Sequence, residues 1–231
     1  MGTLLVLFVY LVYAAFWCRI VVHVFIWYKA TKRFGAWRPP ESEQRCILCA
    51  SAMLDLCFFK RLFLSNKLLW LGSWTFHLSF LFVVLRHLRY FLNPVPRCIT
   101  FIQPVGVVAG YLLPVSLLYL MALRSAGRNR YVSNYVSYYN YFLLGVLLLI
   151  SVTGLFMYRF SFPDLMGVKE FILGLSTFRK ALLPRDFLFI IHFLLVLLLV
   201  PYLPTHFFSA PLVIMEARKR EEALRALMHE K

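Results

Sequence analysis

The chain has 231 residues, of which 61% are apolar and 15% are charged, and its mean hydropathy is +0.74. A soluble globular domain is usually about half apolar, so this excess excludes an ordinary soluble domain and points to lipid as the solvent. The formal net charge of +15 does not indicate nucleic-acid binding, because the basic residues lie between long apolar runs and form no single patch.

Five apolar runs predict an all-α integral membrane protein with five transmembrane helices. Each run is long enough to cross about 30 Å of hydrocarbon as a helix of about 20 residues. The first run lacks the basic start of a signal peptide, so we expect a retained helix. The spans are placed at residues 3–28, 69–92, 105–123, 139–161 and 187–213. Together they predict a single membrane domain over residues 1–213.

The distribution of basic residues predicts the orientation of these helices. With the N-terminus outside, the inner segments hold sixteen Lys and Arg and the outer segments hold six. Cytoplasmic loops carry the excess of Lys and Arg, so the N-terminus is expected outside and the C-terminus in the cytoplasm. Residues 46–64 of the first loop are too interrupted by charges to span, and we expect an amphipathic helix on the cytoplasmic surface. Residues 214–231 are expected to form a charged cytoplasmic helical tail.

Two features of the N-terminal third suggest other chemistry. Arg19 and His23 lie toward the inner end of the first span; they fit interface residues, and a proton or quinone role is the alternative. Cys46 and Cys49 form a CxxC pair in the first loop. Such a pair opens the hypothesis of a quinone-linked thiol oxidoreductase. However, the predicted topology places the pair in the cytoplasm, where a reduced dithiol is expected, and Cys98 outside.

Four histidines fall within two of the predicted spans. His77 and His87 lie in the second span, and His192 and His206 lie in the fifth. Because these helices run in opposite directions, His77 is expected opposite His206 and His87 opposite His192. Separations of ten and fourteen residues correspond to about 15 and 21 Å along a helix. Two prolines interrupt the fifth helix between its histidines and can absorb the difference.

Paired histidines inside a membrane indicate metal binding. An ionisable side chain in lipid is costly and usually functional, and two axial imidazoles give a haem iron suited to electron transfer. There is no CxxCH motif, so covalent c-type attachment of a haem is excluded. Histidines that hydrogen-bond between helices or line a proton path are the alternative. The small residues that make room for porphyrin, or that serve helix packing, are Gly72, Ser73, Ser79, Gly145, Ser151 and Gly154.

With these features, the chain resembles the gamma-subunit (NarI-type) cytochromes b of respiratory nitrate reductase. The resemblance extends to their relatives in sulfur-metabolising membrane complexes, such as DsrM-type subunits. It covers the five spans, the basic first loop and the paired histidines, and its closest local match is His206-Phe-Phe-Ser-Ala-Pro211 followed by Arg218-Lys219. The spacing between the two histidines of the fifth span departs from the nitrate reductase pattern by about one helical turn. That difference favours the sulfur-complex relatives.

The resemblance implies a di-haem b subunit of a respiratory redox complex in the inner (cytoplasmic) membrane. His77 and His206 would bind the inner haem, and His87 and His192 the outer one. The subunit would exchange electrons with menaquinone or another quinone and with a cytoplasmic iron–sulfur partner subunit, in dissimilatory sulfur metabolism. The gamma subunit of nitrate reductase is one alternative, and a cofactor-free membrane anchor is another.

A quinone site near the outer haem would need a group that handles protons. The candidate catalytic residues lie in the outer loop after the fourth span and are Asp164, Lys169 and Glu170. A simple exposed ion pair is the alternative explanation for Lys169 and Glu170. Arg86 and Arg89 at the outer end of the second span are candidates to bind haem propionates. Their alternative role is that of snorkelling side chains at a helix end.

Overall fold

The computed structural model describes residues 2–33, 54–55, 57–126, 138–179 and 182–206. In this part of the chain every regular element is helical and there is no β-strand. Five helices in it are long and apolar enough to cross a membrane, which confirms the predicted number of spans and indicates a multi-pass membrane protein. The orientation in the membrane stays a prediction.

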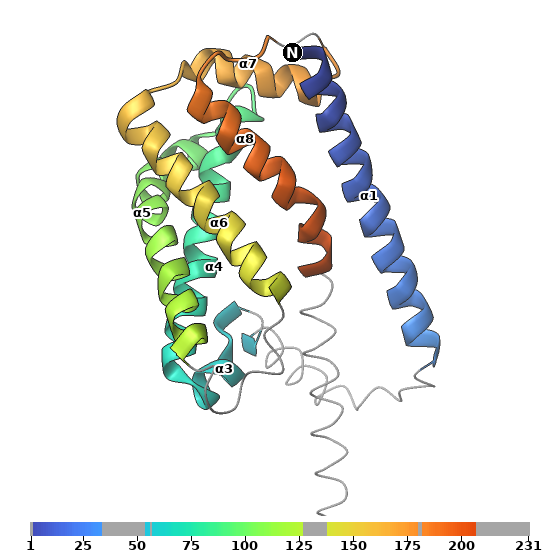
Figure 1. Ribbon diagram of the computed structural model, residues 1–231, viewed down its shortest axis with the longest axis vertical. Coiled ribbons are helices and arrows are strands. Elements are labelled where there is room, and N and C mark those ends of the chain that lie inside the picture. Colours follow the sequence, from blue (N-terminus) through green and yellow to red (C-terminus); the bar gives the residue numbers. More distant parts are fainter. Residues whose placement is uncertain (1, 34–53, 56, 127–137, 180–181, 207–231) are drawn as a thin grey trace, which may run out of the picture. The chain divides into compact units, whose positions relative to one another are not determined.

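The five spans closely match the predicted ones. The long helices are α1 (Gly2–Arg33), α4 (Lys67–His87), α5 (Arg97–Ala126), α6 (Tyr138–Phe156) and α8 (Phe187–Leu199) (Figure 1). The short elements are α3 (Lys60–Ser65), α7 (Leu165–Ser176), η1 (Leu88–Tyr90), η3 (Met157–Ser161) and η4 (Val200–Tyr202). The third span begins at Arg97, earlier than predicted, because Pro104 lies inside α5 and does not end it.

The chain divides into two compact units. The first contains Met1–Val9 and Asn66–Leu199, and the second contains Tyr10–Ser65 and Val200–Lys231. Consequently α4, α5, α6, α7 and α8 all belong to the first unit.

Polar side chains fix where several helices of the first unit begin. Asn66 precedes α4 and accepts a hydrogen bond from the Leu69 amide at 3.0 Å. Asp186 precedes α8 and accepts one from the Phe189 amide at 2.7 Å, while the Ser161 hydroxyl donates to the other carboxylate oxygen of Asp186. These acceptors satisfy amides that the first turn of a helix leaves unpaired.

Glycines set the close packing of α4 on α5. A Cβ atom at Gly72 would lie 2.6 Å from a ring carbon of Tyr119, and one at Gly106 would lie 2.7 Å from Cβ of Arg86. Neither position tolerates a side chain unless its neighbour moves. Of the two roles expected for Gly72, these contacts favour helix packing.

A short helix covers one end of the first unit. α7 lies across the bundle near the start of α8 (Figure 1). It buries Val168, Phe171 and Leu175 against Phe189 of α8. The sequence predicts an outer loop here and gives no sign of α7, because the apolar stripe of this helix is much shorter than a membrane span.

The described part of the second unit holds most of α1, α3 and the end of the fifth span. Near α3, Arg61 forms an ion pair with the buried Asp55 at 3.1 Å. Residues 46–53 and 56 of the predicted amphipathic helix 46–64, and the whole tail 214–231, lie outside the described residues, and so do Cys46 and Cys49.

Candidate functional site: a histidine pair between α4 and α8

Two histidines from different helices of the first unit face each other. His87 is the last residue of α4, and His192 lies in the second turn of α8. Their ring centroids are 6.4 Å apart and the ring planes differ by only 16°. We call this region the His87 level. The structure therefore brings together the two histidines predicted to bind the outer haem.

Both rings use Nδ1 for hydrogen bonding within the protein. Nδ1 of His87 donates to the Val83 carbonyl at 2.6 Å, and Nδ1 of His192 lies 3.0 Å from the Thr153 hydroxyl. No hydrogen bond within the described residues involves Nε2 of either ring. Nε2 is thus the nitrogen that each histidine can offer to a ligand or metal.

The geometry of the pair fits one metal between two imidazoles. Two metal–nitrogen bonds of about 2.0 Å, together with the rings they join, place the ring centroids roughly 6 Å apart.

The spacing between α4 and α8 also bears on whether a haem could lie between the two histidines. Closely packed helices have axes about 8–10 Å apart, which leaves no room for a porphyrin. Among the described helices α4 packs on α5, α5 on α6 and α6 on α8, whereas α4 and α8 are not closely packed.

Two arginines next to His87 supply positive charge, and among the described residues no carboxylate forms an ion pair with either of them. Arg86 contacts the Gln103 carbonyl at 3.5 Å and lies over the Tyr158 ring. Arg89 donates to the Gln103 side chain at 3.2 Å and to the Tyr90 hydroxyl at 2.6 Å. Its Nε is buried and has no partner within the described residues. An unpaired buried donor on a cation is costly, and a haem propionate is a suitable acceptor for it.

The other histidine of α4 is His77, and we call the region around it the His77 level. Nδ1 of His77 lies 2.7 Å from the Ser73 carbonyl, and the ring packs edge-on against Phe76. His206 is exposed and belongs to the second unit. The pairing of His77 with His206 stays a prediction.

The end of the fifth span contains the predicted proline break. The α-helical hydrogen bonding stops at Leu199 and changes to the 3-10 turn η4. Within the second unit, Arg19 of α1 donates to the Pro201 carbonyl at 3.3 Å, and His23 lies 3.1 Å from the Thr205 hydroxyl. A 3-10 turn would offer this carbonyl the amide of residue 204, but Pro204 has none. Arg19 and His23 thus form hydrogen bonds with the end of the fifth span, and their proton or quinone role stays a prediction.

The candidate quinone residues lie around α7. Asp164 precedes α7 and accepts a hydrogen bond from the Met166 amide at 3.0 Å, so it caps the helix. Lys169 contacts the Asn93 side chain at 3.5 Å, and Glu170 is exposed. The ion pair expected between Lys169 and Glu170 is not formed in the described structure. Their role toward a quinone stays a prediction.

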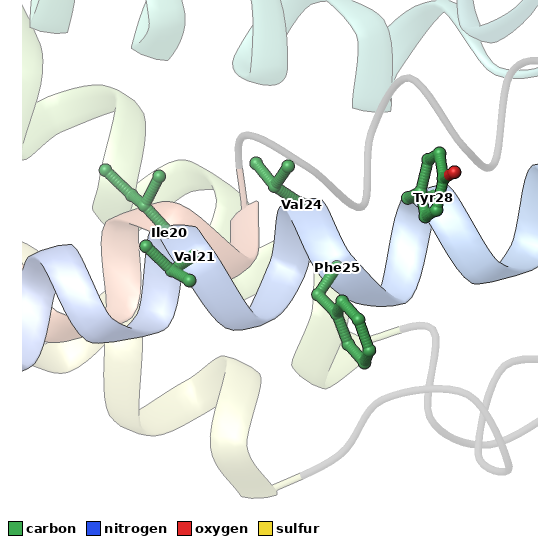
Figure 2. Close-up of a pocket in the computed structure, with 5 residues that line it drawn as sticks. All are labelled: Ile20, Val21, Val24, Phe25 and Tyr28. Carbon is green, nitrogen blue, oxygen red and sulfur yellow. The ribbon is translucent and has the colours of Figure 1, made fainter.

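Other potential sites in the described residues are limited. Cys18, Cys57 and Cys98 are free thiols. No group of three or more His, Cys, Asp or Glu side chains gathers there as a metal site. A hollow of about 360 Å³ beside α1 has a wholly apolar lining (Figure 2). It is lined by Ile20, Val21, Val24, Phe25 and Tyr28. These side chains offer an apolar surface and no carboxylate or imidazole.

The sequence indicates Gly145, Ser151 and Gly154 of α6 only as small residues, and it predicts no contact of α5 or α6 with the histidines or arginines of the site. Thr153 of α6 hydrogen-bonds His192, and a Cβ atom at the neighbouring Gly154 would lie 3.2 Å from the His192 ring. Gln103 of α5 contacts both arginines. A threonine and a glutamine in an apolar helix carry no distinctive spacing, so only the tertiary structure reveals them. Gly154 had been named as a small residue, without its partner.

Comparison with known proteins gives two relatives, both named "Hdr-like menaquinol oxidoreductase cytochrome b-like subunit". The protein from Archaeoglobus fulgidus is 29% identical, with 66% of this chain and 53% of the relative aligned. The protein from Archaeoglobus profundus is 32% identical, with 60% of this chain and 45% of the relative aligned. The chain thus spans about half the length of the curated relatives it matches. No protein-family model and no solved structure matches the chain.

Proposed function

We propose that this chain is a di-haem b membrane subunit of a redox complex that exchanges electrons with menaquinol or menaquinone. His87 and His192 bind one haem, and His77 and His206 bind the other. Electrons pass between the quinone and a cytoplasmic iron–sulfur partner subunit. The names of the two relatives support a menaquinol-linked cytochrome b-like subunit. They favour this role over that of the nitrate reductase gamma subunit, and dissimilatory sulfur metabolism remains its proposed setting.

The observation that carries the proposal is the facing pair of His87 and His192. Their ring separation of 6.4 Å suits two axial ligands of one iron. Hydrogen bonds at Nδ1 leave Nε2 of each ring for the metal. His192 also hydrogen-bonds across helices, to Thr153 of α6. That bond uses Nδ1 and leaves Nε2 for a metal, so it is compatible with a ligand role.

The residues of the chain position the groups between which electrons move. A haem b supplies one-electron chemistry when bound. His87 and His77 are ten residues apart on α4, so their levels are about 15 Å apart along the helix. Arg86 and Arg89 would neutralise the propionates at the His87 level, since the buried Nε of Arg89 has no partner in the part of the chain that the structure describes. We place the quinone near this level as well, with Glu170 and Lys169 of α7 as its proton-handling candidates.

Visible spectroscopy and haem quantitation of the purified full chain test the proposal. We expect two haems per chain and the sharp reduced α-bands of bis-histidine haem. His87→Ala should remove one haem and leave the other largely intact. His229→Ala, which changes a histidine outside the predicted spans, is the matched control and should retain both. A chain without haem, or a His87→Ala variant with unchanged haem content, would disprove the assignment.

The same measurement separates the alternatives. A thiol oxidoreductase that uses Cys46 and Cys49, or a cofactor-free anchor, would give no haem bands. Quinol-driven reduction of the bound haem then tests the link to quinone, with menaquinol and ubiquinol analogues compared side by side. Reduction by neither quinol would leave a haem protein without the proposed substrate.

A further inference from the structure

A third helix, α6, contacts the histidine pair. Thr153 and Gly154 are adjacent residues of α6, and both face the His192 ring. The Thr153 hydroxyl lies 3.0 Å from Nδ1 of His192. A Cβ atom at Gly154 would lie 3.2 Å from Cε1 and 3.6 Å from Nδ1 of the same ring. The ring thus has an oxygen beside one nitrogen and a position without a side chain next to it.

The hydroxyl proton of Thr153 is already in use. Oγ1 of Thr153 lies 2.8 Å from the Leu149 carbonyl and 3.0 Å from the Ile150 carbonyl of its own helix. Carbonyl oxygens only accept hydrogen bonds, so the two of them beside Oγ1 favour a hydroxyl proton that points to one of them. With the proton there, the oxygen accepts from His192. Nδ1 of His192 then carries the ring proton, and Nε2 presents its lone pair.

His87 reaches the same tautomer by a different route. Its Nδ1 donates to the Val83 carbonyl in its own helix. His192 instead finds its partners on the neighbouring helix α6, where the Thr153 hydroxyl lies 3.0 Å from its Nδ1 and the Ile150 backbone also contributes a hydrogen bond. The tautomer of His192 therefore depends on α6, and the Thr153 hydroxyl is the side-chain acceptor that a substitution can remove.

We propose that Thr153 is a positioning residue that holds His192 in the Nδ1–H tautomer and fixes the orientation of its ring, with Gly154 leaving room for that ring. This inference rests on the proposed function in one respect, namely that His192 is a haem ligand. Acceptance of the Nδ1–H bond increases the electron donation of an imidazole to its metal, which stabilises the oxidised form. Thr153 therefore lowers the reduction potential of the haem at the His87 level.

Three variants separate the hydroxyl from the shape of the side chain. Thr153→Val keeps the branched shape and removes the acceptor, Thr153→Ser keeps the hydroxyl, and Gly154→Ala pushes on the ring. Outer-ligand changes of this kind typically alter a metal site about 10–100-fold. For Thr153→Val we expect about a tenfold shift of the redox equilibrium toward the reduced form, or about 59 mV for one electron. Only one of the two haems should respond, and Thr153→Ser should resemble the native chain.

A second readout needs no haem. In full-length chain labelled with ¹⁵N-histidine and prepared without haem, His192 should give the Nδ1–H pattern, and its signal is identified by its loss in His192→Asn. Thr153→Val should shift His192 toward the other tautomer, and Thr153→Ser should not. An unchanged tautomer and an unchanged potential in Thr153→Val would overturn the role of Thr153. A native chain that binds no haem would overturn the proposed function, while the tautomer would still decide the inference.

Discussion

The two histidines of α4 have the same local bonding but different surroundings. Nδ1 of His87 contacts the carbonyl of Val83, and Nδ1 of His77 contacts the carbonyl of Ser73, in each case four residues earlier. A histidine in a helix can therefore set its own tautomer through its own backbone. At the His87 level, tertiary structure then adds His192 and two arginines. The comparison shows that helix-local sequence orients a single histidine, whereas a pair of histidines requires a second helix at the right distance.

The largest effect should come from removing ligands at one level and not the other. We expect His77→Ala and His192→Ala each to remove one haem, and the double variant to lose both. If each level binds its own haem, as proposed, difference spectra of the single variants should add up to the spectrum of the native chain. The measurement is haem per chain together with the reduced α-band. Loss of both haems in either single variant would mean that the two levels are not independent.

A smaller effect is expected from Arg89. Hydrogen bonds to charged groups contribute about 1.5–3 kcal/mol, so removal of its guanidinium should weaken haem retention at the His87 level by roughly 10–100-fold. Arg89→Leu removes the charge, and Arg89→Lys keeps it without the buried Nε donor. Haem transfer to apomyoglobin measures the rate of loss from each level. Equal rates in Arg89→Leu and native chain would indicate that Arg89 does not bind a propionate.

The sequence predicted the five spans because long apolar runs leave few other structures open to them. It also predicted the pair of His87 and His192, because in two antiparallel spans the outer histidine of one lies opposite the outer histidine of the other. It did not predict α7, whose burial depends on Phe189 of α8. Thr153 was missed for a related reason: its partner lies 39 residues further along the chain. Contacts of this kind depend on how helices rotate against one another, which hydropathy does not determine.

Glycine substitutions in the packed face of α4 and α5 sharpen the comparison by acting at one level each. Gly106→Ala would place Cβ against Arg86, next to the His87 level, and Gly72→Ala would place it against Tyr119, nearer to His77. Overpacking typically costs about 1–3 kcal/mol, so both should lower the melting temperature. Gly145→Ala is the control, because nothing lies within 4 Å of its added Cβ. We expect Gly106→Ala to shift the α-band of the haem at the His87 level only.

The smallest predicted effect concerns Asp164, which precedes the helix that buries its apolar face near Tyr90. Loss of an N-cap costs about 1 kcal/mol, so Asp164→Ala should lower thermal stability slightly. Asp164→Asn keeps the capping oxygen and removes the titratable carboxyl group. If Asp164 acts only as a cap, Asp164→Asn should match the native chain both in stability and in the rate of haem reduction by menaquinol. Slow reduction in Asp164→Asn with native stability would instead assign proton transfer at the His87 level to Asp164.

Glu170→Gln alters no hydrogen bond within the described residues, so it should slow haem reduction by menaquinol without changing thermal stability. No change in that rate would remove Glu170 from the proposed quinone site.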